Sequence, residues 1–289
     1  MTNDNFMINN KNRIFKPKIR LPNTDEYNKM SKIIKSNNLH TICSSGRCPN
    51  AAECWGNGTA TFMILGDICT RSCKFCGVKT GKPNPVDDKE PLRIASSVKI
   101  MKLKHAVVTS VNRDDLEDGG ASVWAETILK IKELNPDTTL EVLIPDFQGK
   151  NELIRKIIDA KPEVISHNME TVRKLTPFIR SKAEYEISIS VLKYIVDSGI
   201  TAKSGIMLGL GETENEVLET MDDLSAIGVK IFTLGQYLRP SAQNTAVLEY
   251  ITLEKFKFYE EEGLKRGFKF VESNPLVRSS YHAERHVKA

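Results

Sequence analysis

Apolar residues along the chain fall into two patterns, short continuous runs and longer stretches with helical spacing. The short runs are rich in β-branched residues and predict six strands, at 59–66, 105–111, 139–145, 163–167, 201–210 and 230–238. Between the strands, helical spacing predicts helices at 90–103, 122–134, 151–160, 184–198 and 213–227. The last helix begins with a capping box, in which Glu216 follows Thr213 by three positions.

Strands that alternate with helices favour a parallel sheet with helices outside it, and continuously apolar strands indicate burial on both faces. Two architectures fit this pattern: a doubly wound open sheet and a full or partial barrel. Polar residues and glycines gather just after the strands, at Thr109–Ser110, His167–Asn168, Gly209–Gly211 and Gln236–Tyr237. Because parallel barrels place their sites at that end of the strands, we predict an α/β fold, a partial parallel (β/α)6 barrel of the TIM type.

The N-terminal region carries a different pattern from the rest of the chain. Residues 1–23 are polar, rich in Asn and Lys, and predict a flexible arm. A short helix is expected next, capped by Thr24 or Asp25 and ending at Ser36. Pro49 and several glycines then mark a looped stretch of the kind that can wrap a metal centre.

Composition and charge are those of an ordinary globular protein. The 289 residues are 40% hydrophobic and 27% charged, and the net charge of +4 comes without a long Lys/Arg block. Nothing here indicates a nucleic-acid partner. There is no apolar core of a secretory signal and no stretch of about 20 apolar residues to span a membrane. We expect a cytoplasmic location, where thiols stay reduced and a disulfide framework is disfavoured.

All six cysteines lie between residues 43 and 76, in two groups of three. Cys43, Cys48 and Cys54 form C-x4-C-x5-C, here called the first triplet; Cys69, Cys73 and Cys76 form C-x3-C-x2-C, the second triplet. Three thiolates on a short bent backbone can converge on one iron–sulfur cube or one zinc ion. A zinc site fits less well, because no histidine follows closely. Neither triplet has a fourth cysteine, so a different donor must complete each site.

The second triplet directly follows the first predicted strand and carries Phe75 before its last cysteine. In this it resembles the radical S-adenosylmethionine superfamily. The resemblance implies that Cys69, Cys73 and Cys76 are catalytic and hold three irons of a 4Fe–4S cluster, while S-adenosylmethionine chelates the fourth iron. The cofactor then supplies the radical chemistry and the protein its geometry.

The wider sequence is similar to the lipoyl synthase family over roughly residues 39–283. The motifs that carry this resemblance are CPN and ECW in the first triplet, GDICTRSCKFC in the second, VVTSVNRDDLEDGG (107–120), SHNMETV (166–172), KSGIMLGLGET (203–213), LGQYLRPS (234–241) and VRSSYHA (277–283). One departure is Ser44–Ser45–Gly46, which replaces an acidic pair often seen after the first cysteine. These are not ligand positions, so the assignment stands.

The resemblance implies further site residues. The first triplet would bind an auxiliary 4Fe–4S cluster with Ser280, the serine before Tyr281, as its fourth and catalytically important ligand; the alternative for Ser280 is a polar turn. Contacts to S-adenosylmethionine are expected from Gly119, Gly120, Asn168, Glu170 and Leu238. A simple turn at Gly119–Gly120 and a helix cap at Asn168 remain alternatives. The glycines of GLGE (209–212) do not complete a dinucleotide-binding motif.

The family resemblance also implies a function and a division into three parts. The parts are an N-terminal arm with the auxiliary-cluster loop (1–58), the radical barrel (59–270) and a C-terminal tail that folds back (271–289). The implied activity is that of a sulfurtransferase inserting two sulfur atoms into a protein-bound octanoyl-lysine, with two 4Fe–4S clusters and S-adenosylmethionine as cofactors. Expected partners are octanoylated lipoyl carrier domains, from the acyltransferase subunit of α-ketoacid dehydrogenases and the glycine cleavage H protein, and an electron donor.

Two other functions remain open from the residues alone. One is a radical methylthiotransferase acting on tRNA, which calls for a basic RNA-binding domain that is not visible after residue 240. The other is a binding module stabilised by zinc or a cluster, without catalysis. A metal and sulfide count should give about eight iron and eight sulfide for the sulfurtransferase and zinc for the binding module.

Overall fold

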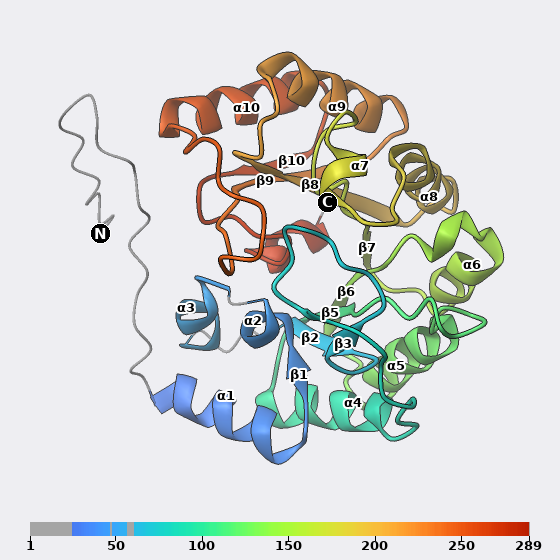
Figure 1. Cartoon of the computed structure of the whole chain (residues 1–289). Helices are drawn as coiled ribbons and strands as arrows, with labels where there is room; N and C mark the ends of the chain where they lie inside the picture. Colours follow the sequence, from blue (N-terminus) through green and yellow to red (C-terminus); the bar gives the residue numbers. More distant parts are fainter. Residues whose placement is uncertain (1–24, 47, 57–60, 289) are drawn as a thin grey trace.

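The computed structural model describes residues 25–46, 48–56 and 61–288 (Figure 1). Its helices are α1 (Asp25–Ser36), α2 (Ile42–Ser45), α3 (Ala51–Gly56), α4 (Glu90–Met101), α5 (Ala121–Leu134), α6 (Asn151–Asp159), α7 (Thr176–Ile179), α8 (Tyr185–Asp197), α9 (Glu214–Ala226) and α10 (Leu253–Lys265), with 3-10 turns η1 (Phe147–Gly149) and η2 (Ala283–Lys288). Its strands are β1 (His40–Thr41), β2 (Thr61–Ile64), β3 (Ile68–Cys69), β4 (Lys79–Thr80), β5 (His105–Ser110), β6 (Thr139–Leu143), β7 (Val164–Ser166), β8 (Thr201–Leu208), β9 (Ile231–Gln236) and β10 (Phe270–Ser273).

The main sheet has the strand order β1-β2-β5-β6-β7-β8-β9-β10. Every neighbouring pair from β2 to β10 is parallel, and β1 joins β2 antiparallel at one edge. The order follows the chain without a reversal, so the sheet lacks the switch point of a doubly wound fold. Helices α4, α5, α6, α8, α9 and α10 lie in an arc outside the strands (Figure 1). The predicted partial (β/α)6 barrel is confirmed, with β10 as an additional last strand.

Local sequence signals explain where several helices begin. Thr213 and Glu216 form the predicted capping box at the start of α9. Pro91 lies in the first turn of α4, where its missing N–H has no partner to lose. Thr252 caps α10 by accepting a hydrogen bond from the Lys255 amide. These caps fix the ends of the helices and therefore the strand connections.

The six predicted strands and five predicted helices between them all form. Three elements of the main fold were not predicted: β1, α10 and β10. The expected domain boundary at residue 270 falls inside β10. The predicted arm (1–23), the alternative cap Thr24 and the first two residues of the predicted strand 59–66 lie outside the described residues, and Asp25 is the first residue of α1.

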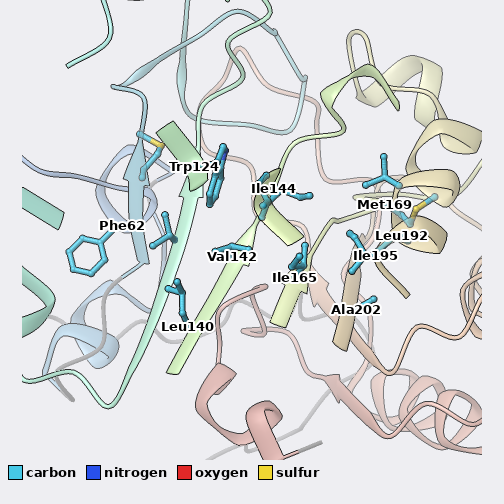
Figure 2. Close-up of a cluster of buried hydrophobic side chains, with 14 of the residues drawn as sticks. Phe62, Trp124, Leu140, Val142, Ile144, Ile165, Met169, Leu192, Ile195 and Ala202 are labelled. Atoms are coloured by element: carbon cyan, nitrogen blue, oxygen red, sulfur yellow. The ribbon is translucent and has the colours of Figure 1, made fainter. Parts of the chain in front are cut away.

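The hydrophobic core lies between the strands and the outer helices. Leu140 and Val142 of β6 share one buried cluster with Trp124 of α5 and with Leu192 and Ile195 of α8 (Figure 2). Side chains alternate along a strand, so the residues between these face the barrel interior. This alternation leaves one face of each strand free to line a site.

The barrel interior contains a polar group of fully buried side chains. Lys203 of β8 donates hydrogen bonds to both carboxylate oxygens of Glu141 on β6, at 2.8 and 3.0 Å, and Ser166 donates to the same carboxylate at 3.0 Å. His286 of η2 is also fully buried, with its Nδ1 3.3 Å from the Lys203 Nζ. The C-terminal segment (residues 274–288) therefore folds back into the barrel, as predicted.

None of the helices within the described ranges has the length and apolar character needed to cross a membrane.

Candidate active site

A cavity of about 510 Å³, here called the main cavity, opens at the carboxyl end of the barrel strands. All six cysteines line it, together with the C-terminal segment from Val277 to Tyr281. Inward-facing strand residues contribute to its apolar part; they are Val107, Leu143 and Met207. The two triplets flank β2. The antiparallel pairing of β1 with β2 carries the chain toward Thr61, at the start of β2, where the Cys43 thiol meets the Thr61 backbone, and the second triplet follows the other end of β2, where the other barrel strands also finish.

The loop of the second triplet is anchored by an arginine between its cysteines. Arg71 makes hydrogen-bonded ion pairs with Asp114, at 2.9 Å, and with Asp146, at 2.6 and 2.8 Å. Thr70 adds hydrogen bonds to the Asn112 carbonyl and to Asp114. The two aspartates follow β5 and β6, so the loop is tied to the ends of two barrel strands. Burial alone would raise the pKa of Asp146, but the Arg71 guanidinium outweighs it and holds that pKa at about 2.

The thiols of the second triplet accept backbone hydrogen bonds, as cluster ligands commonly do. Cys69 Sγ accepts from the amides of Asn112, at 3.3 Å, and Arg71, at 3.4 Å, and Cys76 Sγ accepts from the Val78 amide at 3.5 Å. Burial raises the pKa of Cys76 to about 12, and the neighbouring thiols of Cys73 and Cys69 add to this. Thiols this close repel one another as thiolates, so they suit a cationic centre that offsets the repulsion.

The first triplet is built on two short helices. Cys43 lies in α2, which Thr41 caps through its side chain, and Cys54 lies in α3. Between them the Cys48 amide donates to the Cys43 carbonyl at 3.0 Å, which curls the loop back on itself. Burial raises the pKa of Cys54 to about 12, with further contributions from Cys43 and Cys48. The first triplet thus shows the same crowding of thiols as the second.

The C-terminal segment closes over the first triplet. Ser280 lines the main cavity, as do Cys43, Cys48 and Cys54, and its role as a fourth ligand stays a prediction. The guanidinium of Arg278 lies close enough to Cys48 to lower the pKa of that thiol, although burial has the larger, opposite effect.

The predicted contacts to S-adenosylmethionine separate into two groups. Asn168, Glu170 and Leu238 line the main cavity with the cysteines. Gly119 instead lines a second cavity of about 280 Å³, on the side of Arg71 and Phe147, and Gly120 is the N-cap of α5 with φ 87°. Three of the five residues therefore line the main cavity, while Gly119 lines an adjoining cavity that shares Arg71 and Asn112 with it.

Three arginines belong to this site and were not predicted as parts of it. Arg71 anchors the loop of the second triplet, and Arg278 faces Cys48. Arg180 is buried after α7, where it donates to Met169 O at 3.3 Å and Ser188 Oγ at 2.9 Å. For Arg71 the sequence did hold a signal. An arginine in the loop between Cys69 and Cys73 needs carboxylate partners, and the stretch RDD (113–115) supplies one of them, Asp114.

His167, one of the polar residues that follow the strands, has partners within the protein at both ring nitrogens. His167 is buried in the core, where its two ring nitrogens lie 3.0 Å from the Ile144 carbonyl and from Ser188 Oγ. Burial lowers its pKa to about 4, so the ring is neutral at physiological pH.

The donor set fits two iron–sulfur cubes. Each triplet presents three thiols to the main cavity, and in a cube each thiolate binds a different iron. Among the described residues, no three His, Cys, Asp or Glu side chains are placed to share a single metal ion. Soft thiolates in sets of three are the donors that iron–sulfur clusters prefer.

Comparisons with known proteins show the family. The family profile described as "Radical SAM superfamily" matches residues 63–224. The lipoyl synthase of Phocaeicola vulgatus is 61% identical over 280 residues, covering 96% of this chain and 99% of that protein. The lipoyl synthase of Treponema denticola is 58% identical over 282 residues, covering 98% and 97%. These matches extend over both triplets and the C-terminal segment.

Solved structures share the fold at low sequence identity. Methylornithine synthase matches with a TM-score of 0.53 and 13% identity, over 88% of this chain and 83% of that one. The FeFe-hydrogenase maturase HydG from Carboxydothermus hydrogenoformans matches with a TM-score of 0.56 and 12% identity, over 90% and 78%. These likenesses concern the fold alone. The similarity to the lipoyl synthases excludes the two other functions, a tRNA methylthiotransferase and a binding module without catalysis. The chain belongs to the lipoyl synthase family of the radical S-adenosylmethionine superfamily.

Proposed function

We propose that the second triplet holds the radical 4Fe–4S cluster, that the first triplet and Ser280 hold an auxiliary 4Fe–4S cluster, and that both act on one octanoyl chain. Membership of the superfamily implies one cluster and S-adenosylmethionine; the second cluster and the residue assignments are the proposal. When bound, these groups supply the radical that removes hydrogen from the chain and the sulfur that replaces it.

One observation carries the proposal: the six thiols and Ser280 line the same main cavity. A radical formed beside the second triplet and sulfur held at the first triplet must both reach the same carbon atoms. A shared cavity satisfies this requirement without moving the substrate between sites.

The residues of the chain have separate tasks in this proposal. Arg71, through Asp114 and Asp146, holds the second triplet rigidly against the strand ends. Val107, Leu143 and Met207 give the cavity an apolar wall on which a hydrocarbon chain can lie. Asn168, Glu170 and Leu238 offer polar and apolar contacts for S-adenosylmethionine.

We also propose the partners that the family resemblance implies. The octanoyl group would arrive on a lysine of a lipoyl carrier domain, from the acyltransferase subunit of an α-ketoacid dehydrogenase or the glycine cleavage H protein. A low-potential electron donor would reduce the radical cluster.

The test is an anaerobic count of iron and sulfide on the reconstituted protein. We expect about eight of each per chain, the content of two 4Fe–4S clusters. About four of each would leave the first triplet without a cluster and would contradict the proposal. Zinc in place of iron would contradict it entirely.

A further inference from the structure

Asn168 and Ser279 connect the two halves of the main cavity. Asn168 follows β7, and its side-chain amide nitrogen donates to Ser279 Oγ at 2.6 Å and to Glu170 Oε1 at 3.1 Å. Ser279 precedes Ser280, which lines the main cavity together with the first triplet. One side chain from the proposed S-adenosylmethionine half is thus bonded directly to the neighbour of the proposed auxiliary ligand.

The orientation of the Asn168 amide follows from its partners. A carboxylate such as Glu170 accepts hydrogen bonds, so the amide nitrogen faces it and the amide oxygen points the other way. That oxygen is buried and has no hydrogen-bond partner among the described residues, while the whole side chain is 7% exposed. A buried acceptor without a donor is unfavourable, which leaves Asn168 with an unmet requirement.

A ligand in the main cavity can meet that requirement only by moving the side chain. The amide oxygen is closed off from solvent, so a hydroxyl or ammonium donor reaches it after the amide turns. The amide is planar, and a turn that exposes its oxygen also moves its nitrogen. The nitrogen carries the hydrogen bond to Ser279, so the movement passes to the C-terminal segment.

The segment around Ser279 is fixed at two points, and between them Ser279 and Ser280 form the centre of a turn that the Tyr281 amide closes by donating to the Arg278 carbonyl at 2.8 Å. Val277 is buried, with its carbonyl oxygen so close to Gly235 that a Cβ there would lie 2.1 Å from it. Ala283 is buried at the start of η2. Between these points Ser279 and Ser280 both line the cavity, so a shift of one changes the position of the other.

We propose that Ser279 is a positioning residue, which links the occupancy of the S-adenosylmethionine half of the cavity to the position of Ser280 at the first triplet. The identity of the two ligands rests on the proposed function above. Linkage is reciprocal, so a loaded first triplet that holds Ser280 also prepares Asn168 for S-adenosylmethionine. Because the linkage passes through the single hydrogen bond between Asn168 and Ser279, we expect it to change the affinity for S-adenosylmethionine about fivefold.

The test is a cycle of binding measurements that needs no turnover. The dissociation constant of S-adenosylmethionine is measured anaerobically by equilibrium dialysis on the parent, Cys48→Ala, Ser279→Ala and the double variant, each with its iron counted. We expect Cys48→Ala to weaken binding about fivefold in the parent and less than about twofold in the Ser279→Ala background. Ser279→Thr keeps a hydroxyl and should restore the fivefold difference.

Each other outcome overturns the linkage. An equal effect of Cys48→Ala in both backgrounds means that Ser279 carries no coupling, and a Ser279→Thr variant that behaves like Ser279→Ala means that the hydroxyl is not what matters. If Ser279→Ala holds less iron than the parent, Asn168→Ala takes its place in the cycle, because it removes the same hydrogen bond from the other side. The direct effect of Asn168→Ala on the binding of S-adenosylmethionine is the same with and without Cys48→Ala, so it cancels in the cycle. Failure of the proposed function is recognised separately, because the parent would then lack eight irons or fail to bind S-adenosylmethionine.

Discussion

The side-chain amide of Asn50 donates a hydrogen bond to the Leu276 carbonyl oxygen at 2.6 Å, across 226 positions of the chain. Asn50 lies between Cys48 and Cys54, and Leu276 begins the approach to Ser279 and Ser280. This bond joins the loop of the first triplet to the C-terminal segment, so the segment that carries Ser280 is tied to that loop independently of any cluster. Closing so long a loop costs only modestly more entropy than closing a short one.

Replacing Cys69, Cys73 or Cys76 by Ala should abolish cleavage of S-adenosylmethionine and leave the auxiliary cluster in place. The reason is that each triplet has its own loop, and Arg71 anchors only the second one. The measurements are 5′-deoxyadenosine formation and iron content, which should fall to about four per chain. A variant that forms 5′-deoxyadenosine at the parent rate would disprove the assignment of this triplet.

Replacing Cys43, Cys48 or Cys54 by Ala should have the opposite effect. The second triplet and its anchor at the ends of β5 and β6 remain, so 5′-deoxyadenosine still forms. No sulfur should enter an octanoyl-lysyl peptide, as judged by its mass. Sulfur insertion at the parent level by any of the three variants would rule out the first triplet as the donor site.

Much of the barrel was predictable because its signals are local. The strands β2, β5, β6, β7, β8 and β9 are continuous apolar runs, and the helices between them keep one apolar face, so each element appears within its own ten to fifteen residues. β1 has two residues, too few to give a pattern. α10 has recognisable ends, with Thr252 as its cap and Gly267 at φ 92° after it, but eight of its thirteen residues are charged or glycine, which obscures its apolar face.

The parts of the site that form a spaced sequence motif could be predicted, and the parts that depend on tertiary contacts were missed. The six cysteines stand in two spaced triplets, and the structure places them around one cavity. Arg180 and Arg278 give no such signal, because nothing in the spacing of the sequence marks the groups that they meet, Met169 and Ser188 for Arg180 and Cys48 for Arg278. Gly119 and Gly120 resemble a ligand loop in sequence, whereas Gly120 provides the left-handed residue from which α5 starts.

Ser280→Ala should leave one iron of the auxiliary cluster without its protein ligand. Sulfur insertion should fall at least about tenfold, while 5′-deoxyadenosine formation persists. Ser280→Cys should retain iron at least as firmly but insert sulfur poorly, because a fourth thiolate resists the loss of iron that donation requires. Mass analysis of the peptide and iron counts measure both effects.

Ser279 is not a neutral control for this substitution, because it accepts the hydrogen bond from Asn168. Ser44, an exposed serine after Cys43, is the better control, and Ser44→Ala should keep sulfur insertion within about twofold of the parent. Full activity of Ser280→Ala would show that this serine is not a required ligand.

Asp146→Asn should weaken the anchor of the second triplet in a pH-dependent way. The carboxylate has a pKa of about 2 in the folded chain against 3.8 ordinarily, so its contribution of about 2 kcal/mol is complete above pH 4 and disappears as the pH falls toward 2. The free energy of unfolding, from urea titrations of the iron-free chain, should differ from the parent at pH 7, differ by about half as much near pH 3, and converge with it below about pH 2.

The control for this experiment is Asp159→Asn. Asp159 pairs with Arg155 on the exposed face of α6, so its loss should change the free energy of unfolding by less than about 0.5 kcal/mol at any pH. A difference between Asp146→Asn and the parent that is the same at pH 3 and pH 7 would contradict the role given to the Arg71–Asp146 pair.

The central claim is that sulfur held at the first triplet enters a substrate activated beside the second triplet, within one cavity. The most direct measurement is reconstitution of the protein with isotopically heavy sulfide, reduction, and incubation with an octanoyl-lysyl peptide and S-adenosylmethionine in sulfide-free buffer. Mass spectrometry of the peptide should then find two heavy sulfur atoms per lipoyl product. A product that carries sulfur of natural abundance, with the heavy label still on the protein, would contradict the account.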